Sequence, residues 1–292
     1  MIKPEGIIAA MVTPLTEKDE VNEAELRSQV NRMVAAGVHG LFCLGTNGEF
    51  YALSYEEKIS IMQIVLDENR GRLPVYAGTG CVTTKEAVRV SQAAEALGID
   101  ALSVITPYFV SVSQEELFSY FQEIAMSVKL PVLLYNIPAR TGNNIDYSTF
   151  LRLVKIGNIA GIKDSSGNFD TTLRYIEETN GTVPVLSGND SLILSTLLAG
   201  GAGGISGICN LFPEIVVSIY ELWKKGDIKA ATEAQRNLRP IRDTLKLGNP
   251  NSVVKRAMNL LGYPVGNARK PAVGLSAKLD EEICKALEKY KL

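Results

Sequence analysis

The side chains best suited to chemistry are a lysine, a tyrosine and a threonine at the ends of apolar segments: Lys163, Tyr135 and Thr46. Lys163 closes the sequence Ile-Ala-Gly-Ile-Lys, where burial would disfavour the charged ammonium and leave a neutral amine. A neutral amine in an apolar pocket can attack a ketone and form a Schiff base. A simpler interpretation is an ion pair between Lys163 and the adjacent Asp164. The lysine therefore indicates imine chemistry, with a structural ion pair as the alternative.

Tyr135 and Thr46 supply the hydroxyl groups that imine chemistry needs. Forming and dehydrating a carbinolamine requires a proton carrier, and a phenol serves when a second hydroxyl relays its proton. The turn at residues 45–48 (Gly-Thr-Asn-Gly) could direct amide N–H groups toward a carboxylate, although such a sequence is also typical of a simple tight turn. Arg140, one loop after Tyr135, either binds a second carboxylate at a pocket rim or is a solvated loop side chain.

The composition excludes several other classes of site. The chain of 292 residues has one histidine, His39, which argues against a histidine metal site and a Ser-His-Asp triad. Its four cysteines are scattered, without a CxxC pair, so no disulfide framework is expected. With 30 basic and 32 acidic side chains the formal charge is −2, and no basic stripe predicts a nucleic-acid or membrane surface. No metal is expected, and the chemistry must use lysine, tyrosine, hydroxyl, carboxylate and backbone groups.

Three further features invite functional interpretations that the pattern does not favour. The glycine-rich segment 201–204 could cradle a phosphate, but it precedes an apolar segment, whereas phosphate-binding turns follow a strand. Glu49 and Asp190 could form a carboxylate pair for glycoside hydrolysis, but nothing in the sequence fixes their separation. His39 stands directly before an apolar segment, at the start of a predicted strand. The predicted site lies at the other end of the strands, so His39 is expected to be structural.

Short apolar segments bounded by glycine, proline or aspartate recur along the chain and predict eight strands. They cover residues 7–13, 40–44, 74–78, 101–106, 131–135, 159–163, 183–186 and 204–208. Stretches with helical periodicity lie between them, and three begin with the capping-box pattern, at Ser54, Thr83 and Ser113. Strands that alternate with helices eight times predict a parallel (β/α)8 barrel, the TIM-barrel fold of the α/β class. An open doubly wound sheet is the alternative, but its typical glycine-rich turn does not follow the first segment.

Helical patterns alone follow residue 211 and predict a C-terminal helical extension. The expected helices cover residues 213–225, 227–247, 252–261 and 280–290. We expect a catalytic barrel over residues 1–224 and a helical extension over residues 225–292 that packs on the barrel. No segment approaches the 18 apolar residues of a membrane span, and the start lacks a signal-peptide pattern, so a cytoplasmic protein is expected. In such barrels the functional groups lie at the carboxyl ends of the strands.

Four short motifs follow one another along the chain: Gly-Thr-Asn-Gly-Glu at 45–49, Tyr-Asn-Ile-Pro at 135–138, Gly-Ile-Lys-Asp at 161–164 and Ser-Gly-Asn-Asp at 187–190. In this order they resemble the motifs of the dihydrodipicolinate synthase / N-acetylneuraminate lyase family of class I, Schiff-base aldolases. The resemblance covers nearly the whole chain. It implies that Lys163 forms an imine with pyruvate, that Tyr135 transfers protons and that Thr46 is its hydroxyl partner.

The same resemblance implies how the substrates are held. The backbone of Thr46 and Asn47 would bind the pyruvate carboxylate, and Ile205 and Gly188 would lie near the substrate. No cofactor is implied beyond the covalent imine of pyruvate with Lys163. The implied partners are small molecules, pyruvate and an aldehyde, and the usual assembly of the family implies a homotetramer, a dimer of tight dimers.

The second substrate divides the family, and this chain has marks of both branches. Arg140 stands where the synthases have an arginine for the carboxylate of aspartate semialdehyde. That match favours condensation of pyruvate with aspartate semialdehyde to 4-hydroxy-tetrahydrodipicolinate, in lysine biosynthesis. Asn47, in contrast, replaces the second of two adjacent threonines. Phe109 replaces a tyrosine that reaches the proton relay of a neighbouring subunit, a role that Tyr108 could take over.

Three hypotheses follow for the reaction. The first is the synthase, favoured by Arg140. The second is a lyase of the same family that releases pyruvate from a 2-keto-3-deoxy sugar acid or from N-acetylneuraminate, favoured by Asn47, Phe109 and the polar loop 187–190. The third is a non-catalytic binding relative, against which the complete set of lysine, tyrosine and threonine argues.

Overall fold

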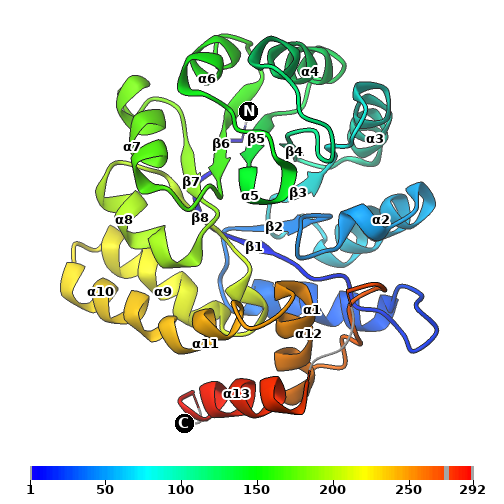
Figure 1. Ribbon diagram of the computed structural model, residues 1–292, viewed down its shortest axis with the longest axis vertical. Helices are drawn as coiled ribbons and strands as arrows, with labels where there is room; N and C mark the ends of the chain where they lie inside the picture. Colours follow the sequence, from blue (N-terminus) through cyan, green and yellow to red (C-terminus); the bar gives the residue numbers. More distant parts are fainter. Residues whose placement is uncertain (1, 273–275, 291–292) are drawn as a thin grey trace.

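A closed barrel of eight parallel strands forms the centre of the computed structural model, which describes residues 2–272 and 276–290 (Figure 1). In chain order the strands are β1 (Gly6–Ala10), β2 (Gly40–Cys43), β3 (Val75–Gly78), β4 (Ala101–Ile105), β5 (Val132–Asn136), β6 (Ile159–Asp164), β7 (Val185–Ser187) and β8 (Gly203–Ser206). Each strand pairs with the next, and β8 pairs with β1. The predicted TIM barrel is confirmed, and the open doubly wound sheet is excluded because the strands close into a ring.

The inward-facing side chains of the barrel form one apolar layer around its axis. The members are Ile8, Ala10, Phe42, Tyr76, Ala101, Leu133, Leu186 and Ile205. Among the described residues, β6 contributes none of them. Because side chains alternate along a strand, its inward positions near the carboxyl end belong to Gly161 and Lys163. The lysine therefore replaces an apolar side chain at the top of this layer.

Helices surround the barrel on its outside (Figure 1). They are α1 (Glu23–Ala35), α2 (Tyr55–Asn69), α3 (Thr84–Leu97), α4 (Gln114–Met126), α6 (Tyr147–Leu153), α7 (Phe169–Glu178), α8 (Ile193–Leu198) and α9 (Pro213–Lys224). The short helix α5 (Pro138–Thr141), which follows β5, lies inside this ring, in front of the strands (Figure 1). The capping boxes predicted at Ser54 and Ser113 are complete, with hydrogen bonds in both directions. At Thr83 the hydroxyl accepts from the Glu86 amide, and no return bond forms within the described residues, so this capping box is half made.

The C-terminal extension consists of α10 (Ile228–Asn237), α11 (Arg239–Thr244), α12 (Pro250–Leu260) and α13 (Ala277–Glu288), drawn in yellow to red (Figure 1). The single helix predicted over 227–247 is therefore wrong. It divides at Leu238 because Pro240 has no amide hydrogen to continue the helical ladder. The side chain of Gln235 ties α10 to the barrel, since it donates to the Asp190 carbonyl and accepts from the Leu194 amide. The division into two domains after residue 224 stays a prediction.

Glycines close the barrel where β8 meets β1. A Cβ atom on Gly203 would lie 2.0 Å from the Gly6 carbonyl oxygen, so only glycine lets the two backbones approach. The segment 201–204 thus serves strand packing rather than phosphate binding. Nearby, the His39 Nδ1 accepts a hydrogen bond from the Ile7 amide, and its Nε2 contacts Glu221 at 3.1 Å. The histidine has the structural role expected from its position before β2.

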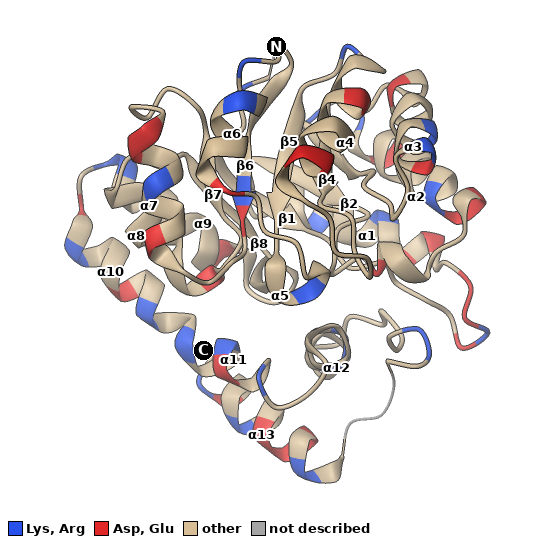
Figure 2. Ribbon diagram, turned by 45° about the horizontal axis from the view of Figure 1, so that its top comes forward, with Lys and Arg blue, Asp and Glu red and all other residues tan. Residues whose placement is uncertain are grey.

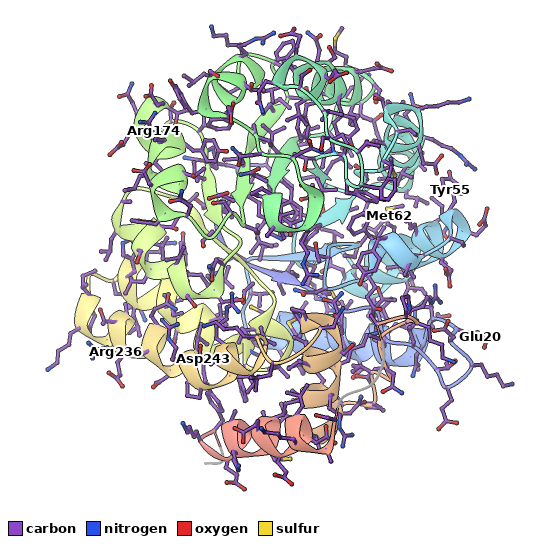
Figure 3. The ribbon with its side chains drawn as sticks, in the orientation of Figure 1. Glu20, Tyr55, Met62, Arg174, Arg236 and Asp243 are labelled. Atoms are coloured by element: carbon purple, nitrogen blue, oxygen red, sulfur yellow. The ribbon has the colours of Figure 1, made fainter. Side chains whose placement is uncertain are left out.

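Charged residues of both signs lie on the outer helices. Acidic and basic residues are interspersed along α10 and α13 (Figure 2). Met62 of α2 is fully buried on the barrel side, whereas Glu20 and Arg236 lie at the periphery (Figure 3). None of the helices in the described parts of the chain combines the length and the hydropathy needed to span a bilayer.

Candidate active site

A cavity of about 190 Å³ lies at the carboxyl ends of the strands, where the functional groups of such barrels gather. All seven residues predicted to touch substrate line it: Thr46, Asn47, Tyr135, Arg140, Lys163, Gly188 and Ile205. The C-terminal helices complete the lining with side chains that the sequence did not single out: Arg242, Leu245, Pro250, Asn251 and Val254. The sequence-predicted residues therefore come together in one place, but the extension supplies part of the wall.

The Lys163 side chain is 4% exposed and lies against an aromatic ring. Its Nζ is 3.9 Å from the centre of the Tyr135 ring and 5.0 Å from that of Phe42. The register of β5 and β6 places Lys163 directly beside Tyr135. An amine held in this way among apolar surfaces is suited to attack a small carbonyl compound entering the cavity.

Asp164 points away from the neighbouring lysine, to the helix side of β6. Its carboxylate accepts hydrogen bonds from Asn136 at 3.1 Å, from Thr172 at 2.7 Å and from Ser166 at 2.8 Å. Within the described residues it forms no ion pair with Lys163. The alternative of a structural ion pair at the strand end is therefore wrong, because alternation along the strand separates the two side chains.

The Tyr135 hydroxyl lies 3.2 Å from the Thr46 hydroxyl, close enough for a hydrogen bond in which either oxygen donates. Tyr135 is 4% exposed and Thr46 is half-buried, so the phenol is largely shielded from bulk water. The phenol lies beside the amine and the second hydroxyl lies behind the phenol, as the predicted proton path requires; the relay itself stays a prediction.

The turn after β2 presents backbone groups to the cavity. Across the described residues, the amides of Thr46 and Asn47 donate to no protein acceptor. Two such N–H groups on one turn are available to a carboxylate, as the predicted binding of an anion at this turn requires. The Asn47 side chain lies over Gly207, where a Cβ atom would come within 2.5 Å of its Nδ2. Gly188 is equally constrained, because a Cβ there would lie 1.9 Å from Ser165 Oγ and 3.0 Å from Lys163 Cε.

The same turn is fixed from behind by the extension. The Asn251 side chain donates to the Thr46 carbonyl at 2.8 Å. Lys255 Nζ lies 2.6 Å from the Glu49 carboxylate, and these side chains are 1% and 2% exposed. The Arg269 amide donates to the second Glu49 oxygen at 2.8 Å. Burial lowers the pKa of Lys255, and the nearby Glu49 charge opposes that shift. The ion pair thus fixes the loop that places Thr46.

The two carboxylates considered for glycoside hydrolysis have separate structural partners. Glu49 is paired with Lys255 and does not line the cavity. Asp190 does line it, but accepts a hydrogen bond from the Ser206 hydroxyl, and burial raises the pKa of its carboxyl group. Glu49 and Asp190 therefore do not face one space, so the geometry of this pair does not support a glycosidase.

Arg140 reaches the cavity from α5, and Phe109 does not reach it. Phe109 is 95% exposed with a φ of 75°, in the loop after β4. Tyr108 packs edge-on against Phe50 at 5.7 Å, and burial raises the pKa of its phenol to about 12. Neither side chain lines the cavity of its own chain. A role for either in a proton relay or at a subunit interface stays a prediction.

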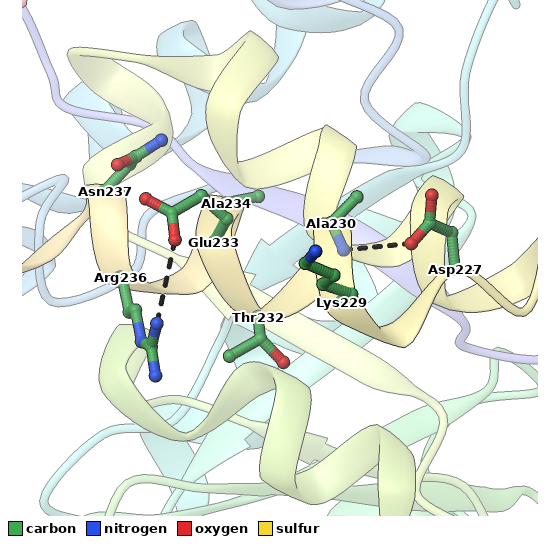
Figure 4. A pocket seen from close by; sticks show the side chains of 8 residues that line it. All are labelled: Asp227, Lys229, Ala230, Thr232, Glu233, Ala234, Arg236 and Asn237. Carbon is green, nitrogen blue, oxygen red and sulfur yellow. Dashed lines mark hydrogen bonds and ion pairs between the residues drawn. The ribbon is translucent and has the colours of Figure 1, made fainter.

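A second hollow, of about 700 Å³, lies along the outer face of α10 and has a different character (Figure 4). Its walls come from one stretch of chain, residues 227–237. There Arg236 and Glu233 form an exposed ion pair at 3.7 Å, and the Asp227 carboxylate caps the helix. None of the residues placed near Lys163 contributes to it. Among the described residues, no three histidine, cysteine or acidic side chains gather as a metal site would require.

Replacing Thr46 with valine should lower kcat about 10- to 100-fold, because the Tyr135 phenol loses its hydroxyl partner while the shape of the side chain is kept. Steady-state kinetics and the rate of borohydride-trapped adduct formation with pyruvate measure the effect. Thr46→Ser keeps the hydroxyl and is the matched control, expected within a few-fold of the parent. Equal losses in the valine and serine variants would contradict the relay.

Comparison with known proteins identifies the family that the four sequence motifs resemble, and the match covers nearly the whole chain. The profile described as the Dihydrodipicolinate synthetase family matches residues 3–290. The 4-hydroxy-tetrahydrodipicolinate synthase of Methanopyrus kandleri is 39% identical over 290 residues, 99% of this chain and 97% of that protein. The 4-hydroxy-tetrahydrodipicolinate synthase 1 of Halalkalibacterium halodurans is 38% identical over 277 residues, 95% of this chain and 94% of that protein.

Solved structures of similar proteins indicate the same family. The 4-hydroxy-tetrahydrodipicolinate synthase of Methylacidiphilum fumariolicum superposes with a TM-score of 0.95 at 32% identity, covering 98% of this chain and 96% of that one. A prophage protein of the dihydrodipicolinic acid synthase family from E. coli K12, in complex with pyruvate, gives a TM-score of 0.94 at 33% identity, covering 98% of both chains. Fold, site and relatives lead to one conclusion: this chain belongs to the dihydrodipicolinate synthetase family and is a lyase of the class I aldolase type.

Proposed function

We propose that this protein is a 4-hydroxy-tetrahydrodipicolinate synthase, which condenses pyruvate with aspartate semialdehyde through an imine on Lys163. The observation behind the proposal is the buried Lys163 amine, 3.9 Å from the Tyr135 ring, with the Tyr135 hydroxyl 3.2 Å from Thr46. The names of the Methanopyrus and Halalkalibacterium relatives support the same reaction. The covalent imine makes a separate cofactor unnecessary.

The geometry suggests how the first half of the reaction proceeds. The Lys163 amine attacks the pyruvate carbonyl carbon, and Tyr135 delivers a proton to the carbonyl oxygen. Water then leaves, the C=N bond forms, and the positive charge rests on the imine nitrogen. Loss of a proton from the pyruvate methyl group gives an enamine, whose carbon attacks the aldehyde. The unpaired amides of Thr46 and Asn47 would hold the pyruvate carboxylate throughout.

In the second half of the reaction, the bond between Lys163 and the product must be broken. The new carbon–carbon bond leaves an alkoxide that takes a proton, with Tyr135 and Thr46 again closest to the amine. The amino group of the former semialdehyde then adds to the imine carbon and expels Lys163 as a free amine. The product is a ring with one hydroxyl and two carboxylates, and Arg140 at the rim suits the carboxylate that comes from the semialdehyde.

The deciding experiment combines borohydride trapping with a substrate panel. Incubation with pyruvate and borohydride should add one reduced pyruvate to Lys163, and condensation with aspartate semialdehyde should exceed pyruvate release from N-acetylneuraminate and from 2-keto-3-deoxy sugar acids. Predominant pyruvate release would instead establish the lyase hypothesis, which Asn47 favours because it replaces the second of the two adjacent threonines of the synthases. Complete absence of an adduct would leave a non-catalytic binding relative.

Replacing Arg140 with methionine should raise the KM for aspartate semialdehyde about tenfold or more, because the charge-assisted contact to its carboxylate is lost. The KM for pyruvate, whose carboxylate would lie at the Thr46 turn, should change much less. Initial rates with each substrate varied in turn measure both constants. Arg140→Lys keeps the positive charge but cannot make a bidentate contact, so its KM for the semialdehyde shows how much the charge alone contributes. An unchanged KM for the semialdehyde in the methionine variant would remove the main reason for preferring the synthase.

Assembly and location complete the proposal. A homotetramer in the cytoplasm is the arrangement that the family resemblance implies, with Phe109 at the position through which a neighbouring subunit would be reached. Its almost complete exposure in a single chain is compatible with burial by a partner. Sedimentation analysis of the purified protein tests the assembly.

A further inference from the structure

The C-terminal extension brings a second arginine to the cavity. Arg242 is on α11, more than 100 residues after Arg140 of α5, yet both side chains line the same space with Lys163. Asp190 is the acidic side chain among the lining residues, and it already accepts a hydrogen bond from the Ser206 hydroxyl. The lining thus offers three basic groups against one engaged carboxylate, which favours an anionic occupant.

Few protein groups satisfy the Arg242 guanidinium. Across the described residues its one hydrogen bond is from NH2 to the Asn189 side-chain oxygen, at 3.3 Å, and it forms no ion pair. Its buried Nε has no acceptor. An unpaired buried donor costs free energy, and a guanidinium can donate five hydrogen bonds. The structure therefore leaves most of the donor capacity of Arg242 free beside the cavity.

The position of Arg242 is nevertheless well defined. The Asn189 side chain that accepts from Arg242 also accepts from the Ser191 amide, so its orientation is fixed by the turn after β7. Gln235 of α10 ties the same turn to the extension through the Asp190 carbonyl. The Arg242 guanidinium thus has few protein acceptors, although the turn that it contacts is fixed by hydrogen bonds. This arrangement is expected of an arginine that binds a ligand rather than of a solvated surface side chain.

We propose that Arg242 is a specificity-determining residue that binds, together with Arg140, the carboxylate of the second substrate. The inference rests on the proposed function and deepens it: with the pyruvate carboxylate at the Thr46 turn, the two guanidinium groups are left for a second anion. Aldehydes that have a carboxylate would satisfy both arginines. Neutral sugar-derived aldehydes would leave the arginines unpaired, and a site of this kind discriminates strongly against such ligands.

The first test replaces Arg242 with methionine, which keeps the length of the side chain and removes its charge. The KM for aspartate semialdehyde should rise about tenfold or more, while the KM for pyruvate should change less than threefold. Arg239→Met is the matched control, because Arg239 is exposed on the same helix and does not line the cavity. Equal KM values for the semialdehyde in the two variants would overturn the proposal.

A second variant separates ligand binding from a purely structural role. Asn189→Asp keeps an acceptor for the Ser191 amide but places a carboxylate against Arg242, where it competes with that of the substrate. If Arg242 binds substrate, this variant should also raise the KM for the semialdehyde. If Arg242 merely holds the turn, the stronger contact should leave that KM unchanged, and the proposal would fail.

An inhibitor that cannot react with Lys163 tests the role of Arg242 separately from the proposed reaction. Glutarate has two carboxylates and no ketone or aldehyde group that could form an imine, so we expect it to block pyruvate adduct formation by occupying the cavity. Its inhibition constant should rise about tenfold in Arg242→Met and stay the same in Arg239→Met. This readout needs no aspartate semialdehyde. A wild-type protein that forms the adduct but does not condense the semialdehyde would end the proposed function alone, whereas unchanged glutarate inhibition in Arg242→Met would end this inference.

Discussion

Replacing Lys163 with methionine should abolish the borohydride-trapped pyruvate adduct and lower kcat at least about 10³-fold. Methionine fills the same space between the Tyr135 and Phe42 rings, so the barrel should fold, but the thioether cannot form an imine. Without the imine, neither the enamine nor the transfer of positive charge to nitrogen is available. Intact-protein mass spectrometry after borohydride treatment, together with steady-state rates, measures the two effects.

Lys155→Met is the matched control for this change. Lys155 is an exposed residue in the segment before β6, and its replacement should leave both the adduct and kcat within twofold of the parent. An adduct of unchanged yield in Lys163→Met would show that another amine reacts with pyruvate. It would also remove the chemical basis of the proposed function.

Replacing Lys255 with methionine should lower the free energy of unfolding by about 3–5 kcal/mol, because it leaves the buried Glu49 carboxylate without its counter-charge. Thr46 precedes Glu49 by three residues, so kcat should fall as well. Equilibrium denaturation with urea gives the free energy, and kinetics at a temperature where the variant is folded give kcat. The double variant Lys255→Met with Glu49→Gln should recover much of the lost stability, because no unpaired buried charge then remains.

An exposed ion pair supplies the control for that experiment. Lys246 Nζ lies 3.1 Å from the Asp243 carboxylate, with both side chains at least half exposed. Lys246→Met removes the same charge from solvent and should cost about 1 kcal/mol or less. Similar losses at Lys255 and Lys246, or no recovery in the double variant, would mean that the buried pair does not stabilise the loop.

The barrel could be predicted from the sequence because its signals are local. Apolar segments ended by glycine or proline mark the strands, and Ser54 and Ser113 form the capping boxes that their spacing indicated. The single helix expected over 227–247 was wrong because Pro240 interrupts a ladder that side-chain periodicity alone cannot reveal. A local signal also identified three residues of the site, Lys163, Tyr135 and Thr46. Each stands at or just after the end of a strand, and the carboxyl ends of the strands meet at the same end of the barrel.

The rest of the site depends on contacts between residues far apart in the chain. Arg242, Asn251 and Lys255 reach the cavity or its loop from the extension, and no spacing rule connects them to Thr46. One signal was present. Lys255 stands among buried apolar side chains of α12, and a lysine on an apolar helix face predicts a buried partner. The identity of that partner, Glu49, required the fold.

The contact between Asn251 and the Thr46 carbonyl spans 205 residues of sequence, and this has a consequence for biosynthesis. Translation delivers the chain from its amino terminus, so a nascent polypeptide holds all eight strands well before α12 has emerged. At that stage Lys163, Tyr135 and Thr46 are already made, but Asn251 and Lys255 are not yet there to hold the turn that contains Thr46. On the proposed mechanism, the turn that would hold the pyruvate carboxylate is fixed only after α12 has emerged. A chain released from the ribosome before α12 is made would contain Lys163, Tyr135 and Thr46 but lack the side chains that fix the Thr46 turn.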